Sequence, residues 1–296
     1  MDRERLLATA PLLAAILWGG MYVVSKWGFS EIPPLTLAFL RIVLGAAVLY
    51  LVVRLTTPSR SFARREWRRF AALAVWLTAA LSTQFVGTDL TNASQGSLLT
   101  ILTPVFMVAL GVSALGERLT GGKVAGIGLA SVGTLVVLLG QYDVRALASG
   151  NGLGAALLLF SAFSFAAFSV FAKPLIERYS ALETATYATV LSVPLFGALV
   201  PVELYLRPDA LASVSMTLPV VGAVLYLGLL STAAAWYCWY KGMEYADAST
   251  VAVYFFAQPV VGIALGAALL GESAGPSVVG GGALLVLGVF LVNRAG

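Results

Sequence analysis

The sequence predicts an all-α integral membrane protein with ten transmembrane helices, arranged as two inverted repeats of five helices each. Three observations support this prediction. Hydrophobic residues make up 59% of the 296 residues and charged residues only 11%, and the mean hydropathy is +0.92. Ten apolar runs follow one another along the chain, and the second half repeats the first at a fixed offset. A water-soluble globule of this size would need far more polar surface.

The ten apolar runs are each about 20 residues long, enough for a helix to cross the hydrocarbon core of a bilayer. They span residues 6–28, 33–56, 69–90, 94–115, 120–140, 151–172, 183–204, 219–240, 249–271 and 276–293. A membrane β-barrel would need short strands of alternating polarity, whereas residues 71–81 and 281–292 are apolar almost throughout. The first run lacks a small-residue cleavage pattern, so we interpret it as a span and not as a signal peptide.

The duplication is visible at an offset of 155 positions without a gap. The repeated phrase is a proline-bearing apolar helix that closes with Leu-Gly-Glu, at Glu117 in the first copy and at Glu272 in the second. We assign residues 1–147 to the first repeat and residues 148–296 to the second, with a polar linker at 141–152. Glycines spaced four apart, such as Gly122 and Gly126, let helix backbones approach. We interpret them as contacts within one chain, so the expected state is a monomer.

The distribution of Lys and Arg predicts the orientation of the chain. If the N-terminus is cytoplasmic, most of the 18 basic residues fall in cytoplasmic loops, with a dense cluster between Arg60 and Arg69. We interpret this cluster as an orientation signal and not as a nucleic-acid site. Both termini are then cytoplasmic, in a multi-pass protein of the bacterial inner membrane. Five helices per half also place the second repeat upside down relative to the first, which is the geometry of alternating access.

Several chemistries are disfavoured by what the sequence lacks. There is no His in the chain, which removes the HExxH zinc motif and the Ser-His dyad, so we expect no enzyme, no metal and no cofactor. Residues 116–124 resemble a phosphate loop only faintly and are better interpreted as a tight turn. Every Asp and Glu, including Glu117 and Glu272, falls near the end of a predicted span. A pump that carries protons on a buried carboxylate is therefore disfavoured.

The prolines of the fourth and ninth runs mark the first candidate site. Pro104 and Pro259 occupy matching positions, and each removes a helical N–H and displaces a carbonyl. Such groups are tolerated at membrane depth beside polar side chains or a water-filled cavity. The polar residues that precede the two prolines, and that we predict to line a substrate cavity, are Gln95, Ser97, Thr100, Thr103, Tyr254 and Gln258. The alternative is that both prolines simply kink their helices.

Aromatic residues form a second candidate wall. Trp18 and Tyr22 lie one turn apart in the first run, and aligning Lys26 with Lys173 makes Trp18 and Phe165 equivalent positions of the two repeats. The further residues that we predict to contact the substrate are Gln84, Trp236 and Trp239. The alternative for the aromatic residues is an interfacial belt, which is strongest for Trp239 and Tyr240 beside Lys241.

Arg41 is the exception among the charged residues, because it lies about two turns inside the second run. One interpretation is structural: the side chain bonds backbone carbonyls or a polar partner at a helix junction, or extends to the outer interface. The other is an anion site for a substrate carboxylate or phosphate. The sequence leaves both open.

These motifs together resemble the EamA type of the drug/metabolite transporter superfamily over essentially the whole chain. The resemblance rests on Leu17-Trp18-Gly19, on Arg41 after Leu40, and on the doubled Pro…Leu-Gly-Glu phrase. It implies export of small metabolites, notably amino acids, through a cavity lined by helices 1, 3, 4, 6, 8 and 9. Exporters of aromatic and other neutral amino acids are the members that the chain resembles most.

Two further functions remain as alternatives. Within the same superfamily, the chain could export cationic or lipophilic drugs, although such pumps commonly place a carboxylate in the membrane. In a different class, a membrane scaffold or receptor would need neither inverted symmetry nor matched prolines. Our leading hypothesis is an exporter of amino acid-like small molecules that works by alternating access without ATP.

Overall fold

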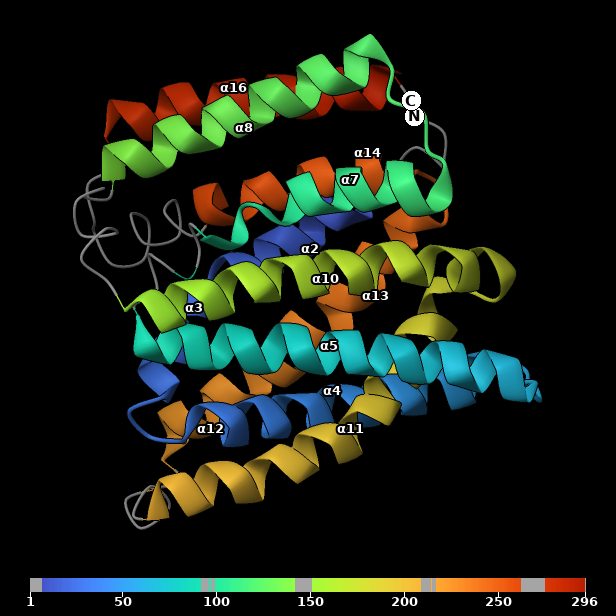
Figure 1. Cartoon of the computed structure of the whole chain (residues 1–296), viewed down its shortest axis with the longest axis vertical. Coiled ribbons are helices and arrows are strands. Elements are labelled where there is room, and N and C mark those ends of the chain that lie inside the picture. The colour runs from blue at the N-terminus through green and yellow to red at the C-terminus, as the bar shows by residue number, and fades with distance from the viewer. Residues whose placement is uncertain are drawn as a thin grey trace.

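The computed structural model describes residues 7–91, 96, 99–141, 151–208, 214, 217–261 and 275–295. Within this part of the chain every regular element is helical (Figure 1). Glu272, the candidate wall residues Gln95 and Ser97, and the predicted repeat boundary at 147 and 148 lie outside the described residues.

Ten helical segments follow the ten predicted runs, and several of them are composite. In chain order the elements are α2 (Ala10–Gly19), α3 (Met21–Gly28), α4 (Pro34–Thr56), α5 (Arg64–Leu90), α7 (Thr103–Leu115), α8 (Gly121–Gln141), α10 (Gly152–Arg178), α11 (Ala181–Leu206), α12 (Leu218–Leu225), the π-helical segment η2 (Tyr226–Ala234), α13 (Ala235–Met243), α14 (Ala248–Ala252), the 3₁₀ segment η3 (Val253–Phe256) and α16 (Pro276–Ala295). Segments α2 and α3 form the first run, α12, η2 and α13 form the eighth, and α14 and η3 form the beginning of the ninth.

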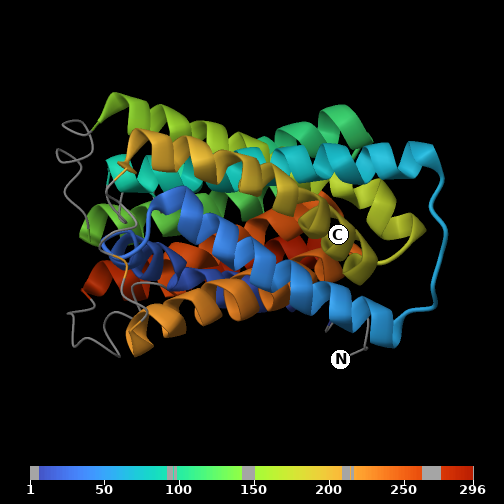
Figure 2. The ribbon, with the colours of Figure 1, turned by 90° about the horizontal axis from the view of Figure 1, so that it is seen from below.

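Six of these helical stretches are long and apolar enough to cross a membrane, and shorter apolar helices accompany them. The helices lie side by side along one direction (Figures 1 and 2). Large apolar side chains such as Leu55, Leu218 and Val279 are exposed, with exposed fractions of 75%, 85% and 72%. Buried polar residues such as Thr189 and Ser231 lie inside instead. This arrangement suits a lipid solvent, and the prediction of an all-α membrane protein is confirmed.

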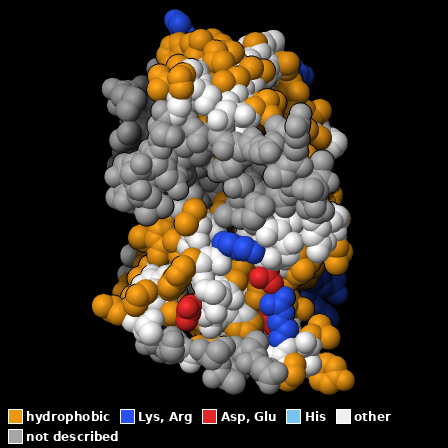
Figure 3. All heavy atoms as spheres, turned by 90° about the vertical axis from the view of Figure 1, so that its left-hand side faces the viewer, with side chains coloured by type: hydrophobic (Ala, Val, Ile, Leu, Met, Phe, Trp, Pro, Cys, Tyr) orange, Lys and Arg blue, Asp and Glu red, His pale blue; other side chains and the backbone are white. Residues whose placement is uncertain are grey.

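The two ends of the helix bundle differ in charge. At one end α2 begins, α16 ends, and α4, α10 and α13 finish with Arg54, Arg178 and Lys241 in their last turns. We call it the basic end. Ion pairs join Arg60 to Glu183 at 3.2 Å and Arg178 to Glu66 at 3.0 Å there. Figure 3 looks onto the opposite end, where the described surface is mostly apolar or uncharged and basic side chains lie beside acidic ones.

Glutamates near the helix ends bind the N-termini of other helices. Both carboxylate oxygens of Glu117 accept backbone N–H groups at the start of α14, from Ala248 at 2.8 Å and Ser249 at 2.9 Å. Glu203 accepts in the same way at the start of α4, and Glu244 at the start of α11. The first N–H groups of a helix have no partner within it and carry partial positive charge, so these carboxylates stabilise the joints between helices.

Two lysines bind the carboxyl ends of helices at opposite ends of the bundle. Lys26 donates to the carbonyls of Thr88, Asp89 and Thr91 at 3.1, 2.8 and 3.2 Å. Lys173 donates to the carbonyls of Met243 and Ala246 at 2.5 and 3.0 Å. Met243 and Ala246 stand 155 positions after Thr88 and Thr91, the offset of the sequence repeat. The same contact therefore recurs in each half of the chain.

Helices α8 and α16 pack along one another at the edge of the bundle (Figure 1). A side chain at Gly126 would come within 2.7 Å of the Gly288 carbonyl oxygen, and one at Gly133 within 2.6 Å of the Gly281 carbonyl oxygen. Residue numbers increase along α8 while those of the contacting residues on α16 decrease, so the two helices are antiparallel. Gly281 and Gly288 are the repeat partners of Gly126 and Gly133, and the pairing is crossed, as in an interface around a two-fold axis.

Candidate transport cavity

Both proline-bearing helices lose regular α geometry next to their prolines. In the fourth run Ile101 and Leu102 form a turn, and α7 begins at Thr103 with Pro104 in its first turn. In the ninth run the 3₁₀ segment η3 ends shortly before Pro259. A 3₁₀ helix has about three residues per turn, so it changes which side chains share a face relative to an α-helix. Phe255 lies in η3 and Gln258 in the helical turn that follows, and both line the cavity described below.

The π-helical segment η2 supplies a third irregularity and holds Arg41. The Arg41 guanidinium is completely buried. Its Nε donates to the Thr232 hydroxyl at 2.9 Å, and its Nη2 donates to the Ser231 carbonyl and hydroxyl at 3.1 and 3.2 Å. The Trp18 indole also donates to the Ser231 carbonyl, at 2.8 Å. A π segment frees carbonyls from the regular helical pattern, and here two side chains use one of them.

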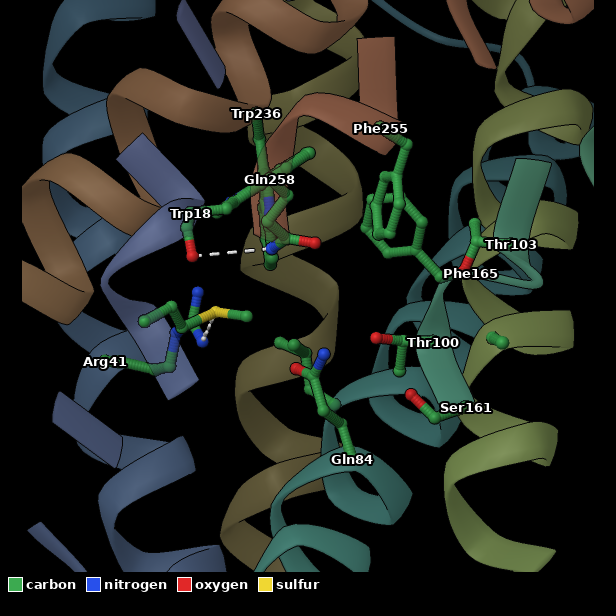
Figure 4. A pocket seen from close by; sticks show the side chains of 13 residues that line it. Trp18, Arg41, Gln84, Thr100, Thr103, Ser161, Phe165, Trp236, Phe255 and Gln258 are labelled. Carbon is green, nitrogen blue, oxygen red and sulfur yellow. Dashed lines mark hydrogen bonds between the residues drawn. The ribbon is translucent and has the colours of Figure 1, made fainter. Parts of the chain in front are cut away.

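A small cavity lies between these irregular segments, in the middle of the bundle (Figure 4). Its lining comes from both halves of the chain: Trp18, Met21, Arg41, Leu81, Gln84, Thr100, Thr103, Ser161, Ala162, Phe165, Trp236, Phe255 and Gln258. The cavity volume is about 20 Å³, close to what a single water requires. The side chains must therefore separate before any metabolite can enter.

Aromatic rings from four helical segments close one side of the cavity. Trp18 meets Phe165 edge to face with ring centroids 5.5 Å apart, and Phe165 meets Phe255 at 5.6 Å. Trp239 packs behind them, 5.3 Å from Trp18 and 5.9 Å from Phe255. Edge-to-face and tilted contacts of this length are favourable beyond the area that they bury.

A chain of polar groups runs along another side of the cavity. The Thr100 hydroxyl donates to the Gly96 carbonyl at 2.8 Å, so the Tyr22 hydroxyl must donate to Thr100, at 2.5 Å. The Tyr22 oxygen then accepts from Gln84 Nε2 at 2.9 Å. This sequence of donors fixes the orientation of the Gln84 amide, and its Oε1 is buried without a partner in the described part of the chain.

Most of the residues predicted to contact a substrate come together around this cavity. Those that line it are Trp18, Gln84, Thr100, Thr103, Phe165, Trp236 and Gln258. Tyr22 and Trp239 lie one layer behind, in contact with lining residues. Tyr254 faces elsewhere: its hydroxyl donates to Asn293 at 2.8 Å, and it borders a separate cleft of about 1060 Å³ between α2, α14 and α16.

The alternative interpretations of two groups of residues are also decided by their positions. Trp239 and Tyr240 are 1% and 0% exposed, so they are core residues and not an interfacial belt. Arg41 does not extend to the interface; it bonds a backbone carbonyl and two hydroxyls at a helix junction, and it also lines the cavity.

The prediction from sequence missed five lining residues: Met21, Leu81, Ser161, Ala162 and Phe255. The repeat offset of 155 would have found two of them, because Phe255 is the partner of Thr100 and Leu81 is the partner of Trp236. No comparable signal marks Ser161 or Ala162, which are small residues on α10.

Comparisons with known proteins agree with this architecture. The family model described as "EamA-like transporter family" matches residues 6–139 and again residues 152–294. A solved crystal structure, 20% identical in sequence, superimposes with a TM-score of 0.77 over 98% of this chain and 95% of the other, which shows a common fold.

Three curated relatives carry names that refer to amino acids. The probable amino-acid metabolite efflux pumps of Escherichia coli and Salmonella typhimurium are 28% and 27% identical over 95% of this chain and 92% of theirs. The probable terminal-alkyne amino-acid exporter of Streptantibioticus cattleyicolor is 34% identical over 68% of this chain and 64% of its own. The two family matches cover nearly the entire sequence, and the chain therefore belongs to the EamA-like transporter family, as a multi-pass membrane transporter.

Proposed function

We propose that the protein exports small metabolites, namely aromatic or other neutral amino acids, across the bacterial inner membrane by alternating access without ATP. The observation that carries the proposal is the central cavity, which both halves of the chain line with aromatic rings and a few polar groups. Apolar surface with a small number of placed polar groups is typical of sites for small amphipathic ligands. The names of the three amino-acid exporting relatives support the same substrate class.

Alternating access is supported by the repeated contacts of the two halves. We propose that residues 1–147 and 148–296 are inverted repeats. The crossed glycine pairs of α8 and α16 follow the 155-residue offset. The carbonyls of Thr88 and Thr91, which Lys26 binds, and those of Met243 and Ala246, which Lys173 binds, are related by the same offset. Two similar halves in opposite orientations can exchange conformations around a fixed central site. The small cavity of about 20 Å³ fits a step of such a cycle in which no substrate is bound.

Export of cationic drugs is less well supported. Within the described residues, the charged side chain that lines the cavity is Arg41, a cation, and no Asp or Glu lines it. A cationic substrate would therefore meet repulsion where a neutral or zwitterionic one would not.

Release from proteoliposomes tests the proposal. Vesicles that contain the purified protein are loaded with labelled tryptophan, phenylalanine, threonine or methionine, and release is followed into amino acid-free buffer. We expect faster release than from protein-free vesicles for at least one of the four, with no requirement for ATP and no stoichiometric proton flux. No acceleration for any amino acid would refute the substrate class.

A pair of alanine substitutions ties transport to the cavity. Ala162 lines the cavity and is 1% exposed, whereas Ala72 is exposed on the outer face of α5. Ala162→Met places a flexible side chain in the cavity and should lower the release rate strongly, while Ala72→Met should leave it unchanged. Elution as a monodisperse peak in size-exclusion chromatography confirms that both variants are folded.

A further inference from the structure

We propose that the cavity recognises the charged backbone of a free amino acid at two points, with Arg41 as the partner of the carboxylate and Gln84 as the partner of the ammonium group. This inference rests on the proposed function and specifies the chemistry of its binding site. Figure 4 shows the two side chains reaching toward the same central space from different helices, α4 and α5.

Arg41 has hydrogen-bonding capacity that its present contacts do not use. Nε and Nη2 are directed at Thr232 and Ser231, but Nη1 contacts only the thioether sulfur of Met21, at 3.2 Å, among the described residues. A thioether is a weak acceptor, and a guanidinium carries five N–H donors. In the described part of the chain no carboxylate pairs with Arg41. A buried cation without a counter-ion is costly in a membrane interior, so a carboxylate that reaches Nη1 gains both charge and hydrogen bonds.

Gln84 has an unused acceptor, which complements the unused donors of Arg41. Its Oε1 is a buried acceptor without a partner among the described residues. Its Nε2 donates to the Tyr22 hydroxyl, which in turn donates to the Thr100 hydroxyl. The amide cannot turn over to satisfy Oε1 without breaking this chain of hydrogen bonds. An ammonium group carries three donors and no acceptor, so it can satisfy Oε1.

The unused donors of Arg41 and the unused acceptor of Gln84 together favour a zwitterion. A simple amine would satisfy Gln84 but leave Arg41 unpaired and face its positive charge. A simple carboxylic acid would satisfy Arg41 but leave the Gln84 acceptor unpaired. The free-energy cost of leaving a buried polar group unpaired exceeds the net gain from forming one hydrogen bond. An analogue that lacks either the carboxylate or the ammonium group should therefore bind weakly. The rings of Trp18, Phe165 and Phe255 then face the amino acid side chain, which favours uncharged side chains.

Ligand binding to the purified protein tests the inference without relying on export. Phenylalanine is compared by isothermal titration calorimetry with its amide, with phenethylamine and with 3-phenylpropionate; leucine and its corresponding analogues form a second series. We expect each analogue to bind at least 10-fold more weakly than its parent amino acid. Equal binding of parent and analogues, or no binding of either parent, would overturn the two-point site.

Variants separate recognition from folding. Arg41→Gln should weaken binding of the parent by about 100-fold, the loss expected when one partner of a buried charged pair is truncated. Arg54→Gln, on the same helix but exposed, is the matched control and should bind normally. Gln84→Glu places a carboxylate where the ammonium group binds, so this variant should gain affinity for phenethylamine. The same carboxylate can pair with Arg41 and compete with the carboxylate of phenylalanine, so affinity for phenylalanine should fall. A merely structural role for Gln84 would produce no such exchange of preference.

The outcomes distinguish this inference from the proposed function. If labelled amino acids are released from proteoliposomes but the analogues bind as well as their parents, export stands and the two-point site is wrong. If the parent amino acids bind selectively but are not released, the site stands and the export function is wrong.

Discussion

Glu117 joins two helices through a single side chain. It follows Gly116, whose backbone lies in the left-handed region at φ 69°, and this turn directs the carboxylate to the first N–H groups of α14. In the first copy of the repeated Leu-Gly-Glu phrase, the glycine forms the turn and the glutamate binds a helix N-terminus. The carboxylate is fully engaged in this structural contact, in keeping with its predicted position at a helix end and away from the cavity.

Truncation of Glu117 should destabilise the protein. Removal of a side chain that caps a helix N-terminus costs about 1–2 kcal/mol, so Glu117→Ala should lower the melting temperature of the detergent-purified protein by several degrees. Glu177→Ala is the control, because Glu177 is 60% exposed and pairs only with Lys173 on its own helix. An unchanged melting temperature for Glu117→Ala would contradict the capping role.

Sequence reasoning placed individual side chains well where the repeat related them. Aligning Lys26 with Lys173 predicted that Trp18 and Phe165 flank a common space, and their rings are in contact. Tyr254 was grouped with Gln258 because both precede Pro259. In the structure Phe255 and Gln258 line the cavity instead, while Tyr254, inside the 3₁₀ segment, is directed toward Asn293. The sequence contains no signal for that change of winding, and the substrate contacts themselves stay predictions.

At the scale of elements, the helices themselves were predictable and their irregularities only partly so. Long apolar runs specify membrane helices, and Pro104 and Pro259 mark two of the breaks. The π segment η2 contains no proline; it is stabilised by tertiary contacts, above all the bonds of Arg41 to Ser231 and Thr232. A structure that depends on a side chain from another helix cannot be recognised from the local sequence.

The packing of α8 against α16 yields a prediction at the same scale. Gly133→Leu would drive a side chain into the Gly281 backbone and should destabilise the protein by about 1–3 kcal/mol or separate the two helices. Gly128→Leu, on the same helix, meets nothing within 4 Å and should be tolerated. The melting temperatures of the two variants give the comparison. Equal values would show that the close glycine contact is unimportant.

At the scale of the whole molecule, charge distribution predicts which end of the bundle faces the cytoplasm. The structure gathers the start of α2, the end of α16 and the Arg60 loop at the basic end. The positive-inside tendency predicts that this end, and with it both termini, faces the cytoplasm. The sequence alone predicts the same orientation. Once the helices are counted, successive short loops must alternate between the two sides of the membrane, so the basic loops can be assigned to one side.

Cysteine labelling tests the orientation. In a Cys238→Ser background, Ser61→Cys marks the basic end and Ser30→Cys the opposite end; both positions are exposed. A membrane-impermeant maleimide added to intact cells should label Ser30→Cys and leave Ser61→Cys unlabelled until the cells are lysed. Labelling in the reverse pattern would invert the topology.

The paired lysine contacts have a consequence for reversibility. Lys26 and Lys173 hold helix ends at opposite ends of the bundle through the same kind of bond, a charged amine on backbone carbonyls. Lys173 also forms an ion pair with Glu177 at 3.3 Å, but the bonds to the helix ends use backbone carbonyls, which do not titrate, so we expect releasing one end to cost about as much as releasing the other. We therefore predict a carrier without an intrinsic direction, which would empty a cell that overproduces its substrate and fill one that is placed in an excess of it.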